Sequence, residues 1–131
     1  MHKPYEKKFN HKADFRVKYC FYTEQEGGRK TLPHQGYRFD FWYVHEDNNA
    51  PNIFIISPEF EDEHGNVILV DDVPVNRCGT ARMWVIVGQR RIYHRDKIHM
   101  GTKGFFMEGA RRVAGCEIIE ILVLQTNPTV E

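Results

Sequence analysis

Two stretches that alternate apolar and polar residues, 15–22 and 37–43, flank a short connecting segment. Alternation with aromatic and β-branched residues is typical of half-buried β-strands. The connecting segment contains three glycines and one proline, namely Gly27, Gly28, Gly36 and Pro33. Because glycine permits positive φ and proline cannot donate to a strand ladder, the segment predicts an ordered loop rather than a tight hairpin.

The rest of the chain continues as short stretches with strand character. Strands are predicted at residues 53–56, 67–70, 80–87, 101–108 and 111–124. Turn-forming composition separates them at 46–51, 61–66 and 71–79. Residues 88–100 fit neither a helical nor a strand period and are predicted to form a loop. Regularly spaced short strands without an amphipathic helix indicate an all-β sandwich or barrel, and barrel closure would remove exposed edges.

A chain of 131 residues is expected to form one domain. We expect a flexible basic N-terminal tail at 1–13, a β domain at 14–124 and a polar C-terminal tail at 125–131. Lys plus Arg and Asp plus Glu both number 18, so the formal charge is zero. This balance argues against a surface that attracts phosphate everywhere, while a local basic face remains compatible with it.

The three cysteines, Cys20, Cys78 and Cys116, are odd in number and widely spaced. No C-x-x-C pair occurs, which argues against a zinc clamp or a thioredoxin-like site. We therefore predict three reduced thiols and a cytoplasmic protein. The N-terminus has no apolar segment typical of a secretory signal, and no apolar run approaches the roughly 20 residues of a membrane helix.

Two acidic and histidine-containing runs, 45–47 and 61–64, are the candidates for metal or catalytic chemistry. Adjacent residues in a strand point to opposite faces, so such runs rarely ligate one metal. Both runs fall at expected loop tips, where solvated charge is the simpler interpretation. Cys–His catalysis needs an activated thiol beside a base, and nothing in the sequence indicates one. We predict no catalytic residue, no metal and no cofactor, and rank an enzyme with a site in residues 44–100 last.

Two motifs stand near the ends of the β region. Residues 26–31 read E-G-G-R-K-T and are followed by G-Y-R at 36–38, and residues 108–115 read E-G-A-R-R-V-A-G. In order and spacing they resemble the E-G-G-R-H-T…G-Y-R and E-G-G-R-T-V-G-A motifs of the C-terminal (third) domain of elongation factor Tu. The resemblance covers about residues 15–122 and is most specific at its two ends. It implies a closed antiparallel β-barrel of about six strands.

The resemblance also implies contacts with tRNA and with protein partners of translation. Arg29 and Lys30 match positions where the family presents Arg and His to the tRNA backbone, and Glu108 and Gly109 match its second contact point. Two positions depart from the family pattern, because Met107 replaces a basic residue and Asp40 replaces a glutamine. Both changes remove attraction for phosphate. The family's GTPase activity is not expected, since the chain contains no G-x-x-x-x-G-K-[ST] phosphate loop.

Other motif residues have mainly structural interpretations. Gly27, Gly28, Gly36 and Gly109 are expected to meet backbone requirements, and Tyr37 belongs to the same loop as the first three. Arg29 has a structural alternative to a binding role, a fixed hydrogen bond that joins this loop to a neighbouring strand. Arg38 and Arg111 are expected to make internal hydrogen bonds.

A basic cluster in the later part of the chain is the best candidate for binding phosphate, and solvated charge is the simpler alternative. Its members are Arg90, Arg91, Arg95, Lys97 and Lys103. Arg90 or Arg91 can replace a cationic residue that the family carries near its last hairpin. Trp42 and Trp84 are either stacking or interface residues, or core residues.

The sequence thus supports two main hypotheses. The first is a non-catalytic module that docks on protein partners related to the translation machinery. The alternative is an RNA-binding module that grips tRNA-like stems through phosphate contacts made by Arg29, Lys30 and the basic cluster.

Overall fold

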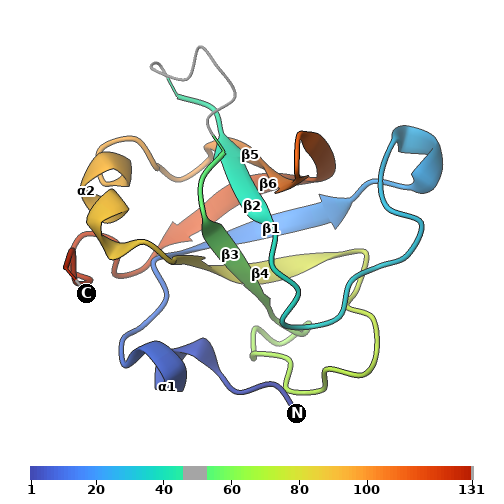
Figure 1. Cartoon of the computed structure of the whole chain (residues 1–131), viewed down its shortest axis with the longest axis horizontal. Helices are drawn as coiled ribbons and strands as arrows, with labels where there is room; N and C mark the ends of the chain where they lie inside the picture. Colours follow the sequence, from blue (N-terminus) through green and yellow to red (C-terminus); the bar gives the residue numbers. More distant parts are fainter. Residues whose placement is uncertain (46–52, 131) are drawn as a thin grey trace.

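The computed structural model of the protein describes residues 1–45 and 53–130 (Figure 1). The described part contains one antiparallel six-stranded sheet with strand order β2-β5-β6-β1-β4-β3. Its strands are β1 (Phe15–Phe21), β2 (Asp40–Tyr43), β3 (Ile56–Phe60), β4 (Cys78–Val85), β5 (Lys103–Glu108) and β6 (Arg111–Ile121). Short helices accompany it: α1 (Tyr5–Phe9), α2 (Arg91–His94), and the 3₁₀ turns η1 (Glu24–Glu26) and η2 (Gly88–Arg90).

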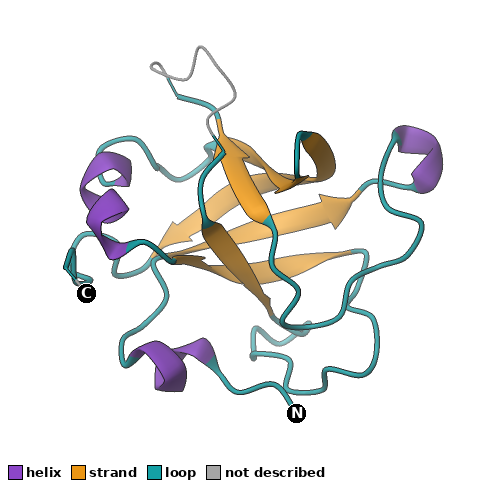
Figure 2. Ribbon diagram, viewed as in Figure 1, coloured by secondary structure: helices purple, strands orange, loops and turns teal. Residues whose placement is uncertain are grey.

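The sheet curls into an open half-barrel, so the predicted closure of the barrel is wrong (Figure 2). Within the described residues, the edge strand β2 meets the segment before β3 through one isolated bridge, between Phe41 and Phe54. Their backbone N–H groups and carbonyls exchange two hydrogen bonds of 2.9 Å. The Ile56 N–H then donates back to the Phe54 carbonyl at 3.0 Å. This local turn ends the pairing before a continuous β2–β3 ladder can form.

The concave face of the sheet carries the main core, as the alternation in residues 15–22 predicts. Phe15, Val17, Tyr19 and Phe21 of β1 are all buried. Aromatic rings from several strands surround Phe106 of β5, with centroid distances of 5.7–6.3 Å. Contacts of this kind add to the stabilisation that the burial of apolar area gives the core.

Strand β3 differs in position from the prediction, because it spans 56–60 rather than 53–56. It includes Pro58, which a sheet tolerates at an edge strand. Gln35 covers part of the free edge: its side-chain amide donates to the Phe60 carbonyl at 2.8 Å and accepts from the Phe60 N–H at 2.9 Å. The predicted strand at 67–70 is reduced to an isolated Glu61–Val67 bridge and a few backbone hydrogen bonds.

The N-terminal segment packs against the sheet, in contrast to the flexible tail expected from its charge. Helix α1 lies beside the β3–β4 part of the sheet (Figure 1), and the Tyr5 ring meets Trp84 edge-on at 5.9 Å. Buried Glu59 accepts hydrogen bonds from the Tyr5 N–H at 2.8 Å and the Trp84 Nε1–H at 3.2 Å, and its carboxylate lies 2.6 Å from His2 Nε2. Trp84 is therefore a core residue.

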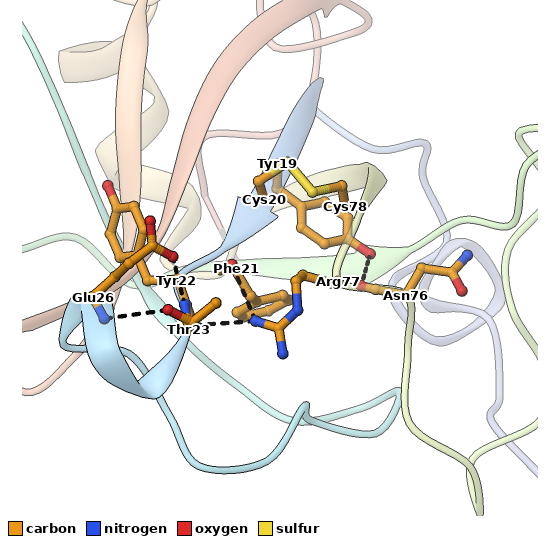
Figure 3. Close-up of a disulfide and its surroundings, with 9 residues drawn as sticks. All are labelled: Tyr19, Cys20, Phe21, Tyr22, Thr23, Glu26, Asn76, Arg77 and Cys78. Atoms are coloured by element: carbon orange, nitrogen blue, oxygen red, sulfur yellow. Dashed lines mark hydrogen bonds between the residues drawn. A yellow bond between two sulfur atoms is a disulfide. The ribbon is translucent and has the colours of Figure 1, made fainter.

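The prediction of three reduced thiols is wrong, because Cys20 and Cys78 form a disulfide (Figure 3). The two cysteines are directly opposite each other in the β1–β4 ladder, although they are 58 residues apart in the chain. Cys116 is free and buried. In the chain-entropy model a cross-link over a loop of this length stabilises the fold by about 4 kcal/mol.

The described part of the chain contains no helix that is long and apolar enough to cross a membrane.

Candidate binding surface

The two motifs near the ends of the β region meet in space at Glu108, the last residue of β5. The Glu108 carboxylate accepts hydrogen bonds from the Tyr37 hydroxyl at 2.6 Å and from Arg111 Nη2 at 2.7 Å. It also forms an ion pair with Arg29. We call Arg29, Tyr37, Glu108 and Arg111 the Glu108 cluster.

The loop that carries Arg29 begins with a capping box at η1. The Thr23 N–H donates to Glu26 Oε1 at 2.8 Å, and the Glu26 N–H donates to Thr23 Oγ1 at 3.2 Å. Gly27 follows with φ of +94°, a conformation that favours glycine. At Gly28 a Cβ atom would lie 2.2 Å from the Tyr22 carbonyl oxygen, so only glycine fits without movement of the backbone. These features fix where the chain turns toward Glu108.

Arg29 and Tyr37 form a stacked pair at the surface. The Arg29 guanidinium carbon lies 4.5 Å from the centroid of the Tyr37 ring, within cation–π range. Arg29 Nε also donates to the Thr31 carbonyl at 3.1 Å. The Tyr37 ring packs at 4.8 Å against Phe39, which is buried, while Tyr37 itself is 41% exposed. The pair is thus anchored to the core and still accessible.

The hairpin between β5 and β6 supplies the other half of the cluster. Gly109 in its turn has φ of +61°, and Glu108 and Arg111 are opposite each other in the ladder. The two departures from the family pattern lie beside this hairpin, since Asp40 of β2 is paired with Met107 of β5.

The electrostatics of the cluster centre on the carboxylate. Burial would raise the pKa of Glu108, but hydrogen bonds from Tyr37 and Arg111 and the charge of Arg29 outweigh it and lower the pKa. Glu108 is therefore ionised at neutral pH and neutralises one of its two guanidinium partners. Lys30 beside the cluster is exposed.

A shallow groove of about 540 Å³ adjoins the cluster. Arg29 and Tyr37 form one side of it, and Leu32, Pro33 and Pro74 provide apolar lining. An isolated bridge between His34 and Pro74 holds the two loops that form the groove. Sequence reasoning missed this groove, because its walls are about 40 residues apart in the chain.

Two arginines of the basic cluster predicted in residues 90–103, Arg91 and Arg95, make hydrogen bonds within the fold. Arg91 is buried, and its Nε donates to Asp14 at 2.8 Å while its Nη2 donates to the Val85 carbonyl at 2.9 Å. Arg95 donates to the carbonyls of Leu124 and Asn127. Residues 88–100 were expected to be a loop but include η2 and α2, which carry these arginines inward. Arg90 remains exposed, on the α2 side of the molecule.

Three further predicted residues lie in or near the loops. Gly36 has φ of +93°, a backbone conformation that favours glycine. Arg111 bonds internally to Glu108. Arg38 is exposed and lies near Tyr5 of α1. Burial raises the pKa of the Tyr5 phenol, and the positive charge of Arg38 opposes that rise.

Trp42 lies half-buried on the convex face of the sheet, outside the Glu108 cluster. Its ring and Phe105 are 5.6 Å apart, and the Arg112 guanidinium stacks over both, at 5.3 Å and 4.1 Å. The buried Trp42 Nε1–H has no hydrogen-bond partner in the described structure.

The acidic runs do not form a metal site in the part of the chain that the structure describes. Glu46 and Asp47 lie outside the described residues. Glu61 was expected at a solvated tip but is buried, and it accepts hydrogen bonds from Arg16, Thr80 and Arg82 at 2.7–3.2 Å. Its role is structural.

A scan against models of protein families finds no match to the chain, and a search of curated proteins finds none either.

Proposed function

We propose that the protein is a non-catalytic binding module that resembles the C-terminal domain of elongation factor Tu. It docks on a protein partner of the translation machinery through the Glu108 cluster and the adjoining groove. The proposal places it in the cytoplasm, where translation takes place. The observation that carries it is the meeting of both family-like motifs in one accessible cluster, although their residues are 71 to 79 positions apart.

The composition of the cluster favours a protein partner. Arg29 is stacked on Tyr37 and paired with Glu108, so a phosphate would have to displace or approach a carboxylate to reach it. Arginine and tyrosine are the residue types that most often dominate binding energy in protein interfaces. Leu32, Pro33 and Pro74 give the groove an apolar lining that a nucleic acid backbone does not need.

One observation favours the alternative, a module that grips tRNA-like stems. Arg111 of the cluster and its sequence neighbour Arg112 are exposed, as is Lys30 next to Arg29, and together they carry three positive charges. Binding of this kind weakens steeply as salt rises, because phosphate contacts release counterions. A gel-shift titration of tRNA at low and high salt tests it directly. Tight binding that is lost at high salt supports the alternative, and no shift at low salt excludes it.

The proposal itself is tested by affinity capture from cell extract with the full chain as bait, with and without nuclease. We expect the same translation protein in both samples. Tyr37→Ala should reduce its recovery at least tenfold, the effect of an interface residue that contributes more than about 1.4 kcal/mol.

Lys7→Ala is the matched control, because Lys7 is exposed on α1, away from the cluster. It should leave recovery unchanged. Recovery of nucleic acid alone, or equal recovery by wild type and Tyr37→Ala, would overturn the proposal.

A further inference from the structure

The Cys20–Cys78 disulfide lies on the convex face of the sheet, and both of its cysteines are exposed. Cys20 points to this face because residues of β1 alternate, with Tyr19 and Phe21 buried on the other side. Figure 3 shows the sulfur–sulfur bond between the two strands, with Arg77 and Asn76 continuing the chain beside it. Because both cysteines are exposed, an attacking thiol can approach the disulfide from solvent.

The disulfide lines a shallow hollow of about 560 Å³. Phe105 and Gly115 contribute apolar surface on the side of β5 and β6, and Lys18, Lys103 and Glu117 surround it. At Gly115 a Cβ atom would lie 3.2 Å from the Tyr22 hydroxyl oxygen, so the Tyr22 ring lies over this part of β6. The hollow is large enough to hold a tripeptide-sized molecule next to the sulfur atoms.

The rim of the hollow has a net positive charge. Glu117 is ion-paired with Lys103, and Lys18 Nζ lies 3.9 Å from its second carboxylate oxygen. Two ammonium groups thus face one carboxylate. Lys18 and Cys20 are two residues apart in β1 and share its convex face, and strand geometry places their Cα atoms about 7 Å apart.

We propose that Cys20–Cys78 is a thiol–disulfide exchange site for small thiols that carry negative charge. This inference rests on the proposed function for the cytoplasmic location, whereas the exchange chemistry does not involve the Glu108 cluster. Disulfides of cytoplasmic proteins are usually transient or redox-sensing rather than permanent. The rim attracts an anionic thiol, and both exposed cysteines line the hollow that the thiol would enter.

The exchange proceeds in two displacements. The thiolate of the small molecule attacks Cys78 Sγ, the sulfur–sulfur bond breaks, and Cys20 leaves as a thiolate that the Lys18 charge stabilises. A second small thiolate then attacks the sulfur of the bound molecule, which releases the Cys78 thiolate and one small-molecule disulfide. Two small thiols are oxidised, the protein disulfide is reduced by two electrons, and the cysteine thiolates take up protons from solvent.

Hydrogen bonds around the disulfide do not involve the two cysteines, so they continue to hold the neighbouring chain segments when the disulfide is reduced. The Phe21 N–H donates to the Arg77 carbonyl at 2.8 Å, and the Tyr19 hydroxyl donates to the Asn76 carbonyl at 3.0 Å. Cys116 takes no part, because it is buried, and burial raises the pKa of its thiol.

The test is the rate at which reduced glutathione, an anionic thiol, opens the disulfide in the full chain. Samples are quenched with an alkylating reagent and the free thiols are counted by mass spectrometry, in native buffer and in concentrated urea. We expect a native rate within about tenfold of the unfolded rate, because access is already provided. A native rate more than about a hundredfold slower would show that the site is closed and overturn the proposal.

Charge selection is tested with 2-mercaptoethanol as the neutral reference thiol. Lys18→Gln should lower the ratio of the glutathione rate to the 2-mercaptoethanol rate by about threefold, the effect of one charge at about 7 Å in water. Lys7→Gln, a control on α1, should leave the ratio unchanged, and high salt should abolish the difference. An unchanged ratio in Lys18→Gln would refute selection for anionic thiols.

Discussion

Two regions of the molecule use the same Arg–carboxylate chemistry in opposite surroundings. At the α2 end, defined by Asp14, Arg91, His94 and Asn127, the Arg91 and Asp14 side chains are 4% and 0% exposed. At the Glu108 cluster, the Arg29 and Glu108 side chains are 19% and 26% exposed. Figure 1 places α2 and the C-terminus on one side of the sheet and the loop after β1 on the other.

The difference lies in what completes each ion pair. The Asp14 carboxylate also accepts hydrogen bonds from the Val85 N–H and the Asn127 amide, both at 2.8 Å. Arg91, Val85 and Asn127 are all buried, whereas Tyr37 and Arg111 beside Glu108 are exposed. This network joins the start of β1 to α2 and to the C-terminal segment, which was expected to be a polar tail. A buried pair that loses one partner leaves an uncompensated charge inside the fold, whereas a partly exposed pair remains accessible to a binding partner.

The largest effect is expected from Asp14→Ala. Removing one partner of a buried ion pair leaves the Arg91 charge uncompensated and costs about 3–5 kcal/mol of unfolding free energy. Urea denaturation measures the loss. Arg90→Ala at the exposed neighbouring position should change stability by less than about 0.5 kcal/mol. Equal stability of Asp14→Ala and wild type would show that the α2 end does not hold the fold.

Acid should weaken the α2 end through His94. Burial, and next the charges of His45, Lys97 and Arg90, lower the pKa of His94 from 6.5 to about 4. The unfolded chain therefore binds this proton first, and stability falls as pH drops from 6.5 toward 4, by about 3 kcal/mol in total. His94→Gln should remove this part of the pH dependence in urea titrations across that window. An identical acid dependence in the variant would contradict the assignment.

In the loop that carries Arg29 of the Glu108 cluster, Gly28→Ala tests whether the backbone must pass so close to Tyr22. The added Cβ would meet the Tyr22 carbonyl oxygen, and the loop must move to relieve the overlap. We expect a loss of about 1–3 kcal/mol, typical of overpacking, measured by thermal or urea unfolding. Gly27→Ala should cost less: its φ strains any other residue, but the space beside it is free. The reverse order would mean that steric fit is not what requires Gly28.

The smallest effect is expected from Glu108→Gln. A partly exposed ion pair contributes less than about 1 kcal/mol to the free energy of unfolding. The pKa of Glu108 in the folded protein is lower than its ordinary value of 4.5. The stability that the ionised carboxylate contributes is therefore fully present above pH 4.5 and is lost as the pH falls through the folded-state pKa. The variant should be slightly less stable than wild type at neutral pH, and the difference should shrink in acid. A loss as large as that of Asp14→Ala would remove the distinction between the two regions.

Short-range patterns predicted much of this fold. Alternation located β1, β4, β5 and β6 and identified the buried face of β1, because a strand half-buried in a sheet imposes a period of two on its own residues. The docking of α1 had a weaker signal, since Tyr5 and Phe9 are four residues apart and share one helical face. The surrounding lysines outweighed that signal.

Features that join distant parts of the chain had no local signal. The disulfide, the Arg29–Glu108 pair and the Asp14–Arg91 pair connect residues 58, 79 and 77 positions apart. Whether Arg91 or Arg90 faces solvent depends on the turn of η2 into α2, which the composition of residues 88–100 does not reveal. Barrel closure likewise depends on how β2 and β3 approach each other in space.

The central claim is that the protein works by protein contact at the Glu108 cluster, and site-specific photo-crosslinking tests it most directly. A photoreactive residue replaces exposed Lys30, next to Arg29, and a second variant carries it at Lys7 as the control. We predict crosslinks from position 30 to one translation protein, resistant to nuclease and absent from position 7. Crosslinks from position 30 to RNA alone, or the same products from both positions, would contradict the claim.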